Sequence, residues 1–205
     1  MPQIIHDAGW PIWLLLFTSV IGLALIIERL VTLRPKRVMP SKLLAQVTSM
    51  MQDRLDTPEA LGRLASSSPL GRVLAEVLAA SGEPRPVRER AIEDVGRDVA
   101  HRLGRYLPAL GTIAVVAPLL GLFGTVVGMI EIFGSYSPAG GDPAQLARGI
   151  SVALYNTGFG ILIAIPALIF HRYFRSRVDD YVHQMERQAG SLDRLLGKER
   201  SRPND

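Results

Sequence analysis

The chain has 205 residues, of which 48% are hydrophobic and 6% aromatic, and it carries 23 basic and 19 acidic residues. Its mean hydropathy of +0.21 is high for a soluble domain of this size, so the apolar residues must be concentrated in particular segments. The absence of cysteine excludes disulfides, thiolate metal sites and cysteine nucleophiles. Although the pI is 9.8, the basic residues are interleaved with acids along the chain, which argues against a nucleic-acid partner.

The first apolar segment, residues 10–30, predicts a transmembrane helix. Residues 10–27 carry no charge, and a bilayer core about 30 Å thick needs about 20 residues at about 1.5 Å each. Glu28 and Arg29 can complete the span by extending toward the lipid headgroups. A cleaved signal peptide would need basic residues before the apolar run, and residues 1–27 have none. We therefore expect a retained membrane anchor.

Residues 31–105 predict a basic helical segment punctuated by proline and glycine. Thr57 and Ser68 each precede a proline, and this pair is typical of an N-cap followed by a first helical turn. From Pro86 the sequence can stay helical through Gly104 and into the next apolar segment. A single continuous helix is therefore expected to join the two.

Two further apolar segments, residues 106–132 and 149–171, predict the second and third transmembrane helices, which residues 133–148 connect. Residues 172–205 continue as an amphipathic helix with a polar end, and its apolar stripe requires a partner helix. The stripe consists of Val178, Tyr181, Val182, Met185, Ala189, Leu192, Leu195 and Leu196. The partner is either the helix over residues 86–105 of the same chain or another subunit.

The distribution of basic residues predicts the orientation in the membrane. Residues 28–105 hold 14 Lys or Arg and residues 172–205 hold 8, whereas the rest of the chain holds only Arg148. Because cytoplasmic segments are enriched in Lys and Arg, we expect residues 31–105 and 172–205 in the cytoplasm. Residues 1–9 and the connection between the last two spans are then expected outside. The predicted fold class is an all-α membrane protein with three transmembrane helices, the second and third extended into a cytoplasmic helical bundle.

Small residues in the last two spans indicate close helix packing. Gly124 and Gly128 have the GxxxG spacing that lets membrane helices approach closely. The glycines expected at helix contacts are Gly121, Gly124, Gly128, Gly158 and Gly160. Pro118 and Pro166 each remove an intrahelical hydrogen bond, so a kink is expected at both.

Polar residues inside the spans are the best functional candidates, because a polar group in a bilayer needs a partner or a water-filled path. They are Thr125, Asn156 and Thr157. A threonine alone usually donates to its own helix backbone, whereas an asparagine amide cannot be satisfied in that way. No residue pattern indicates a metal site, a cofactor or an enzyme. We also expect none of the apolar spans to contain a buried acid or base able to pass a proton across, so a second chain must supply the titrating group if ions cross.

The stretch from Ala117 to Phe133 reads APLLGLFGTVVGMIEIF, and the stretch from Gly149 to Phe174 reads GISVALYNTGFGILIAIPALIFHRYF. These motifs resemble the last two helices of the MotA/TolQ/ExbB proton-channel family. The likeness extends over about residues 86–196, and the order of the remaining segments agrees with it. Within the family the pattern is most similar to the ExbB branch and next to TolQ, while the cytoplasmic segment is short for MotA.

The resemblance implies a multi-pass protein of the bacterial inner membrane, with a periplasmic amino terminus and a cytoplasmic carboxyl terminus. It implies a homopentamer in the lipid bilayer. The second and third helices of the five copies line a pore that surrounds an ExbD-like or TolR-like partner. That single-span partner carries the proton-accepting aspartate. Thr125 and Thr157 match the family's pore-lining threonines, and Asn156 adjoins them. The resemblance further implies a motor, not an enzyme and without a cofactor, that energises a TonB-like periplasm-spanning protein for outer-membrane transport.

One position departs from the family pattern. Many relatives have a glutamate five residues before the threonine of the third helix, where this chain has Val152. Glu131, at the outer end of the second helix, or Asn156 is a candidate to replace it. The alternative functions are a TolQ-like subunit for envelope maintenance, a gliding or flagellar motor subunit, a non-conducting membrane scaffold and, less supported, a solute-transporter subunit. The transported ion is either a proton or sodium.

Overall fold

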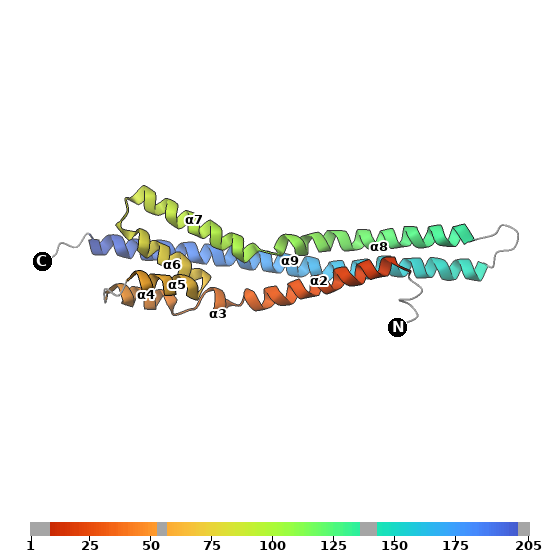
Figure 1. The fold of residues 1–205 in the computed structure, drawn as a ribbon, viewed down its shortest axis with the longest axis horizontal. Coiled ribbons are helices and arrows are strands. Elements are labelled where there is room, and N and C mark those ends of the chain that lie inside the picture. The colour runs from red at the N-terminus through yellow and green to blue at the C-terminus, as the bar shows by residue number, and fades with distance from the viewer. Residues whose placement is uncertain (1–8, 53–56, 136–142, 201–205) are drawn as a thin grey trace. The chain divides into compact units, whose positions relative to one another are not determined.

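The computed structural model describes residues 9–52, 57–135 and 143–200, and the chain divides into two compact units. We call Met1–Arg29 together with Tyr106–Tyr173 the apolar unit, and Leu30–Arg105 together with Phe174–Asp205 the basic unit. The described residues form helices and no strand (Figure 1), which confirms the all-α prediction.

The apolar unit is built from α2 (Pro11–Thr32), α8 (Leu107–Ser135) and the first part of α9 (Pro143–Arg200). The described residues contain three helical stretches long and apolar enough to cross a membrane, one for each predicted span. Within this unit α8 and α9 run side by side (Figure 1). Many of their large apolar side chains point outward, such as Leu119 at 59% and Leu162 at 64% exposure, as expected for surfaces that face lipid.

The continuous helix expected from Pro86 into the second span is interrupted. Arg105 has an extended backbone with ψ 139°, and Tyr106 adopts a left-handed conformation with φ 70°. Pro108 explains the break, because its ring would clash with the carbonyl group of residue 104 in a continuous helix. A new helix begins instead, with the amide of Leu110 donating to the carbonyl oxygen of Tyr106 at 3.1 Å.

The basic unit contains α3 (Pro35–Val38), α4 (Leu43–Gln52), α5 (Pro58–Ser67), α6 (Pro69–Ala79), the 3₁₀ turn η1 (Ala80–Gly82) and α7 (Arg85–Gly104). Of these, α3, α5, α6 and α7 begin at or beside a proline. Both predicted N-caps are confirmed. The hydroxyl of Thr57 accepts a hydrogen bond from the amide of Ala60 at 3.3 Å, and that of Ser68 accepts one from Gly71 at 3.0 Å.

Helix α6 forms the core of the basic unit and packs against α3, α4, α5 and α7. Its side chains Leu70, Leu74 and Val77 are completely buried. Glycine 71 allows the close turn between α5 and α6, because a Cβ there would lie 2.3 Å from the carbonyl oxygen of Leu64. The sequence of short proline-initiated helices thus folds around one apolar helix.

The apolar stripe of α9 packs within its own chain in the basic unit. Tyr181, Met185 and Leu192 are at most 3% exposed, whereas Leu195 is 42% exposed and lies outside the contact. The hydroxyl of Tyr181 donates to the carbonyl oxygen of Leu33 at 2.8 Å. Arg88 of α7 forms an ion pair with Asp193 at 2.6 Å. The stripe is thus buried within its own chain, with a hydrogen bond from Tyr181 to Leu33 and an ion pair between α7 and α9.

Candidate functional site: the contact between α8 and α9

The backbones of α8 and α9 approach closely at two glycines. A Cβ added to Gly160 would lie 2.5 Å from the carbonyl oxygen of Ala117, and one added to Gly121 would lie 2.6 Å from that of Asn156. Real Cβ atoms essentially never come within 3.0 Å of another atom in this way. The two helices can therefore keep this separation only while both positions lack a side chain, as in other small-residue membrane contacts.

Asn156 fills the space that Gly124 leaves open. A Cβ on Gly124 would lie 2.8 Å from the Cβ and 3.0 Å from the Nδ2 of Asn156, whose side chain is 1% exposed. One turn further along, a Cβ on Gly128 would lie 3.3 Å from the Cβ of Ala153. The residue expected to line a proton path is thus enclosed between two helices of its own chain.

Gly158 does not take part in this contact. A Cβ added there would meet nothing within 4 Å, and the residue is exposed. Successive helical residues are rotated by about 100°, so Gly158 points away from the face that carries Gly160. The helix contact expected for Gly158 is therefore absent from the described part of this chain.

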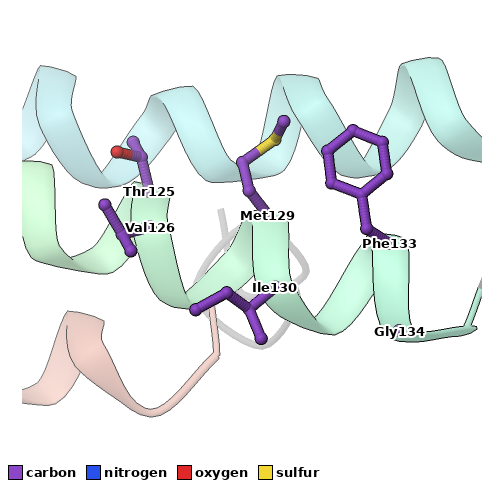
Figure 2. A pocket seen from close by; sticks show the side chains of 6 residues that line it. All are labelled: Thr125, Val126, Met129, Ile130, Phe133 and Gly134. Atoms are coloured by element: carbon purple, nitrogen blue, oxygen red, sulfur yellow. The ribbon is translucent and has the colours of Figure 1, made fainter.

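Thr125 is partly exposed on α8, one turn beyond Gly121. Figure 2 shows Thr125, Met129 and Phe133 in a row along α8, with Val126 and Ile130 in a second row below them. Together with Gly134 they line an open hollow of about 600 Å³, in which the hydroxyl of Thr125 is the one polar side-chain group. That hydroxyl donates to the carbonyl oxygen of Leu122 at 2.7 Å, so its lone pairs are left to accept a hydrogen bond.

Thr157 is placed at the same helix contact from α9. Its Cα would lie 3.0 Å from a Cβ on Gly121, and its side chain is partly exposed. Because Gly121 and Thr125 are four residues apart, they share one face of α8. The two threonines therefore come from facing helices at neighbouring turns, with the buried Asn156 next to Thr157.

The prolines lie inside their helices, Pro118 in α8 and Pro166 in α9, and neither ends its helix. Each lacks the N–H that would bond to the carbonyl oxygen four residues earlier. Pro118 directly follows Ala117, whose carbonyl oxygen faces Gly160. A weakened point in the hydrogen-bond ladder of α8 thus adjoins the closest approach of the two helices.

The two positions considered for an acid near the outer mouth differ in exposure. Glu131 is exposed near the end of α8, and Val152, at the position of the family glutamate, is partly buried. Among the described residues, no group of three His, Asp or Glu is arranged to hold a metal ion. From Gly121 to Gly128 the contact therefore offers hydroxyl groups and close packing, whereas the imidazole of His171 lies against Gly111, nearer the start of α8.

Arg29 is a buried charge near the end of α2 and is 3% exposed. The sequence predicts that it extends toward the headgroups and does not indicate this burial within the chain. Its guanidinium lies 5.1 Å from the ring centroid of Tyr106, and its Nη2 donates to Glu28 at 2.7 Å. A neighbouring carboxylate and an aromatic face compensate the charge. The ring becomes available because Tyr106 leaves the helical conformation, which the sequence reading did not anticipate.

Comparison with known proteins gives a consistent result. Residues 65–187 match the model of the MotA/TolQ/ExbB proton channel family. A biopolymer transport protein of Synechocystis, ExbB-like 3, is 28% identical over 93% of this chain and 92% of its own length. The biopolymer transport protein exbB1 of Vibrio cholerae is 31% identical over 82% of this chain and 76% of its own length. ExbB of Neisseria meningitidis is 25% identical over 97% and 99%.

The matched region contains α8, the apolar part of α9 and the whole contact between them. Its apolar helices and its relatives agree with a multi-pass membrane protein that acts as a transport or channel subunit. The chain belongs to the MotA/TolQ/ExbB proton channel family.

Proposed function

We propose that this chain is the ExbB-like subunit of an inner-membrane motor. Together with an ExbD-like single-span partner, it uses the proton motive force to energise a TonB-like protein for transport across the outer membrane. Five copies form a ring in which α8 and α9 wall the pore. Residues 1–9 and 133–148 lie in the periplasm, and the basic unit lies in the cytoplasm, as its 20 Lys and Arg in residues 30–105 and 174–205 favour.

The observation that carries this proposal is the α8–α9 contact, which presents Thr125 and Thr157 at neighbouring turns of tightly packed apolar helices. Neither apolar stretch, residues 107–130 nor 149–170, contains a charged residue. A wall of this kind can guide a proton but cannot hold one. The titrating group is therefore assigned to the aspartate of the partner.

The threonine hydroxyls have a defined role in this mechanism. An ionised carboxylate inside a bilayer costs at least about 2.5 kcal/mol, so it is stable only beside polar groups. Thr125 already donates to its own backbone, and it can accept a hydrogen bond from the protonated form of the partner carboxyl. Asn156 supports this wall from within the helix contact. Each inward proton releases about 2.3 kcal/mol per 100 mV, and neutralising the aspartate changes which part of the wall it prefers.

Two alternatives remain testable. A TolQ-like subunit would have the same wall with a TolR-like partner, and its deletion would impair the envelope rather than siderophore-dependent growth. A non-conducting scaffold would use the close packing alone, and uncouplers would leave its biological output unchanged. The ExbB names of several relatives favour the first proposal over both.

The decisive experiment is proton flux through the reconstituted complex. The chain is purified with the single-span protein that accompanies it under mild solubilisation, and the complex is placed in liposomes that contain a pH-sensitive dye. Thr157→Ala should lower flux at least about tenfold, since one lost hydrogen bond in the transition state corresponds to roughly 1.4 kcal/mol. Thr157→Ser, which keeps the hydroxyl, should retain most of the flux.

Thr18→Ala is the matched control. Thr18 of α2 also donates to its own helix, to Leu14 at 2.8 Å, but lies on a different helix from the proposed wall. Its replacement should leave proton flux unchanged. Normal flux in Thr157→Ala would exclude the assigned wall. Absence of flux in the wild-type complex would favour the scaffold, and repeating the assay with a sodium gradient distinguishes the two ions.

A further inference from the structure

We propose that a pocket in the basic unit binds the phosphate of an anionic phospholipid headgroup. The pocket has a volume of about 900 Å³ and is lined by residues of α2, α3, α5, α6 and α7. This volume is within the usual range for small-ligand sites. The inference is independent of proton transport, because none of the lining residues belongs to the α8–α9 contact.

The charge of the pocket selects an anion. It is lined by four cationic side chains, those of Lys36, Arg37, Arg72 and Arg102. None of its lining residues is acidic. One carboxylate, that of Asp98, forms ion pairs with both arginines, with Arg72 at 2.9 Å and with Arg102 at 3.2 Å. In the described part of the chain, Lys36 and Arg37 have no ion pair. These two exposed cations can therefore pair with an external anion.

The geometry of the pocket suits a phosphate. Ser68, 8% exposed, accepts a hydrogen bond from Gly71 and keeps its own hydroxyl proton to donate. It caps α6, whose N-terminus contributes a partial positive charge. Arg72, one turn into the same helix, is held by Asp98 with its side chain 36% exposed. A guanidinium in a fixed position favours bidentate contact with phosphate oxygens.

The place of these residues in the chain favours a lipid over a soluble phosphate. Thr32, which lines the pocket, is the last residue of the apolar helix α2, and Lys36 and Arg37 follow it within five residues. Arg102 lies five residues before the apolar helix α8 begins at Leu107. Basic groups at the ends of membrane spans lie at the depth of the headgroups, where basic pockets bind anionic lipids.

The test measures lipid affinity of the full-length protein. The protein is titrated in nanodiscs that contain phosphatidylcholine with increasing phosphatidylglycerol, and bound lipid is counted by native mass spectrometry. Each cation near an anionic surface contributes a factor of about five to binding. Lys36→Gln combined with Arg37→Gln should therefore weaken phosphatidylglycerol binding roughly 30-fold. Both side chains are exposed and without an ion pair in the described chain, so the fold should be retained, as thermal unfolding without added lipid verifies.

The matched control is Lys42→Gln combined with Arg63→Gln. It removes the same charge from exposed positions of the same unit that do not line the pocket. Unchanged affinity in this control supports the proposal, whereas an equal loss in both double variants reduces the effect to net charge and overturns it. Equal affinity of the Lys36 and Arg37 variant and the wild type also overturns it. Glycerol 3-phosphate is titrated in parallel. If it binds as tightly as phosphatidylglycerol, with the same dependence on Lys36 and Arg37, the ligand is a soluble phosphate ester and the lipid proposal is refuted.

Discussion

The helices inside the apolar unit and those inside the basic unit pack together in opposite ways. In the apolar unit, α8 and α9 meet where side chains are missing, at Gly121 and Gly160. In the basic unit, α6 is surrounded through large apolar side chains such as Leu70 and Leu74, which are completely buried. The difference follows from the solvent. Lipid tails are as apolar as leucine, so burying leucine gains little in a membrane, and close backbone packing takes its place.

The same comparison explains the distribution of exposed apolar residues. In the apolar unit, Val115 and Leu162 are 65% and 64% exposed, although both lie inside predicted spans. In the basic unit, exposed positions of α7 are occupied by charged residues, including Glu93 and Arg97. Removing side-chain volume should therefore damage the basic unit, and adding volume should damage the apolar unit. The following substitutions test this difference, in order of decreasing effect.

Leu74→Ala should have the largest effect. Leu74 is completely buried in α6, and loss of its side chain leaves a cavity in the core of the basic unit. We expect the free energy of unfolding to fall by about 2 to 5 kcal/mol. The measurement is unfolding followed by circular dichroism in detergent. Leu195→Ala, at a position 42% exposed on α9, is the matched control and should change stability little. Equal effects at the two positions would contradict the assignment of α6 as the core.

Gly160→Ala should destabilise the apolar unit although it adds a single methyl group. The new Cβ would lie 2.5 Å from the carbonyl oxygen of Ala117, so the two helices must separate. Overpacking of this kind costs about 1 to 3 kcal/mol. The loss is measured by thermal unfolding, and the separation by spin labels on α8 and α9.

Gly158→Ala is the control for that substitution. It is two residues away in the same helix, and its Cβ would meet nothing within 4 Å. It should be neutral or stabilise the isolated chain by about 0.5 to 1 kcal/mol, because alanine loses less backbone entropy in a helix. If Gly158→Ala instead prevents assembly while the isolated chain remains stable, Gly158 contacts another subunit.

Tyr181→Phe should cost about 1 kcal/mol in the basic unit. It removes the hydrogen bond from the hydroxyl to the carbonyl oxygen of Leu33 at 2.8 Å, in a buried position. Thermal unfolding measures the change. Tyr155→Phe, at a residue 45% exposed, serves as the comparison and should have no measurable effect. An unaltered melting temperature for Tyr181→Phe would show that the bond contributes nothing net.

Arg97→Gln should have the smallest effect. Its side chain and that of its partner Glu93 are 70% and 61% exposed, and exposed pairs contribute about 0 to 1 kcal/mol. Arg88→Gln should cost more, because the pair with Asp193 is 17% and 28% exposed and joins two helices. Reversal of this order in chemical unfolding would mean that ion pairing does not link α7 to α9.

Local features of the sequence were predictive wherever the determining residues are neighbours in the chain. Proline after Thr57 and Ser68 identified both N-caps, and the period of apolar residues identified the stripe of α9 that contains Tyr181 and Leu192. The interruption at Tyr106 was also local, and Pro108 was the signal that the sequence reading overlooked. Helix propensity alone did not reveal this interruption, because the residues before and after Tyr106 are in helices.

Contacts between distant segments were beyond the reach of sequence patterns. The small-residue motif indicated that two membrane helices pack closely, but it did not distinguish Gly160, which faces Ala117, from Gly158, which faces away. Nor did it indicate that Asn156 is enclosed by Gly124. Such distinctions depend on the rotation of one helix against another, which is decided by the fit of many side chains.

By itself the sequence determined the three apolar helices, the basic character of the segments between and after them, and the family, because hydropathy, charge and motif are properties of consecutive residues. The tertiary structure decided which glycines lie in the α8–α9 contact, where Arg29 is buried, and that cations from α3, α6 and α7 converge on one pocket. Lys36 and Arg102 are far apart in the chain, and only the packing of the helices that carry them brings them together.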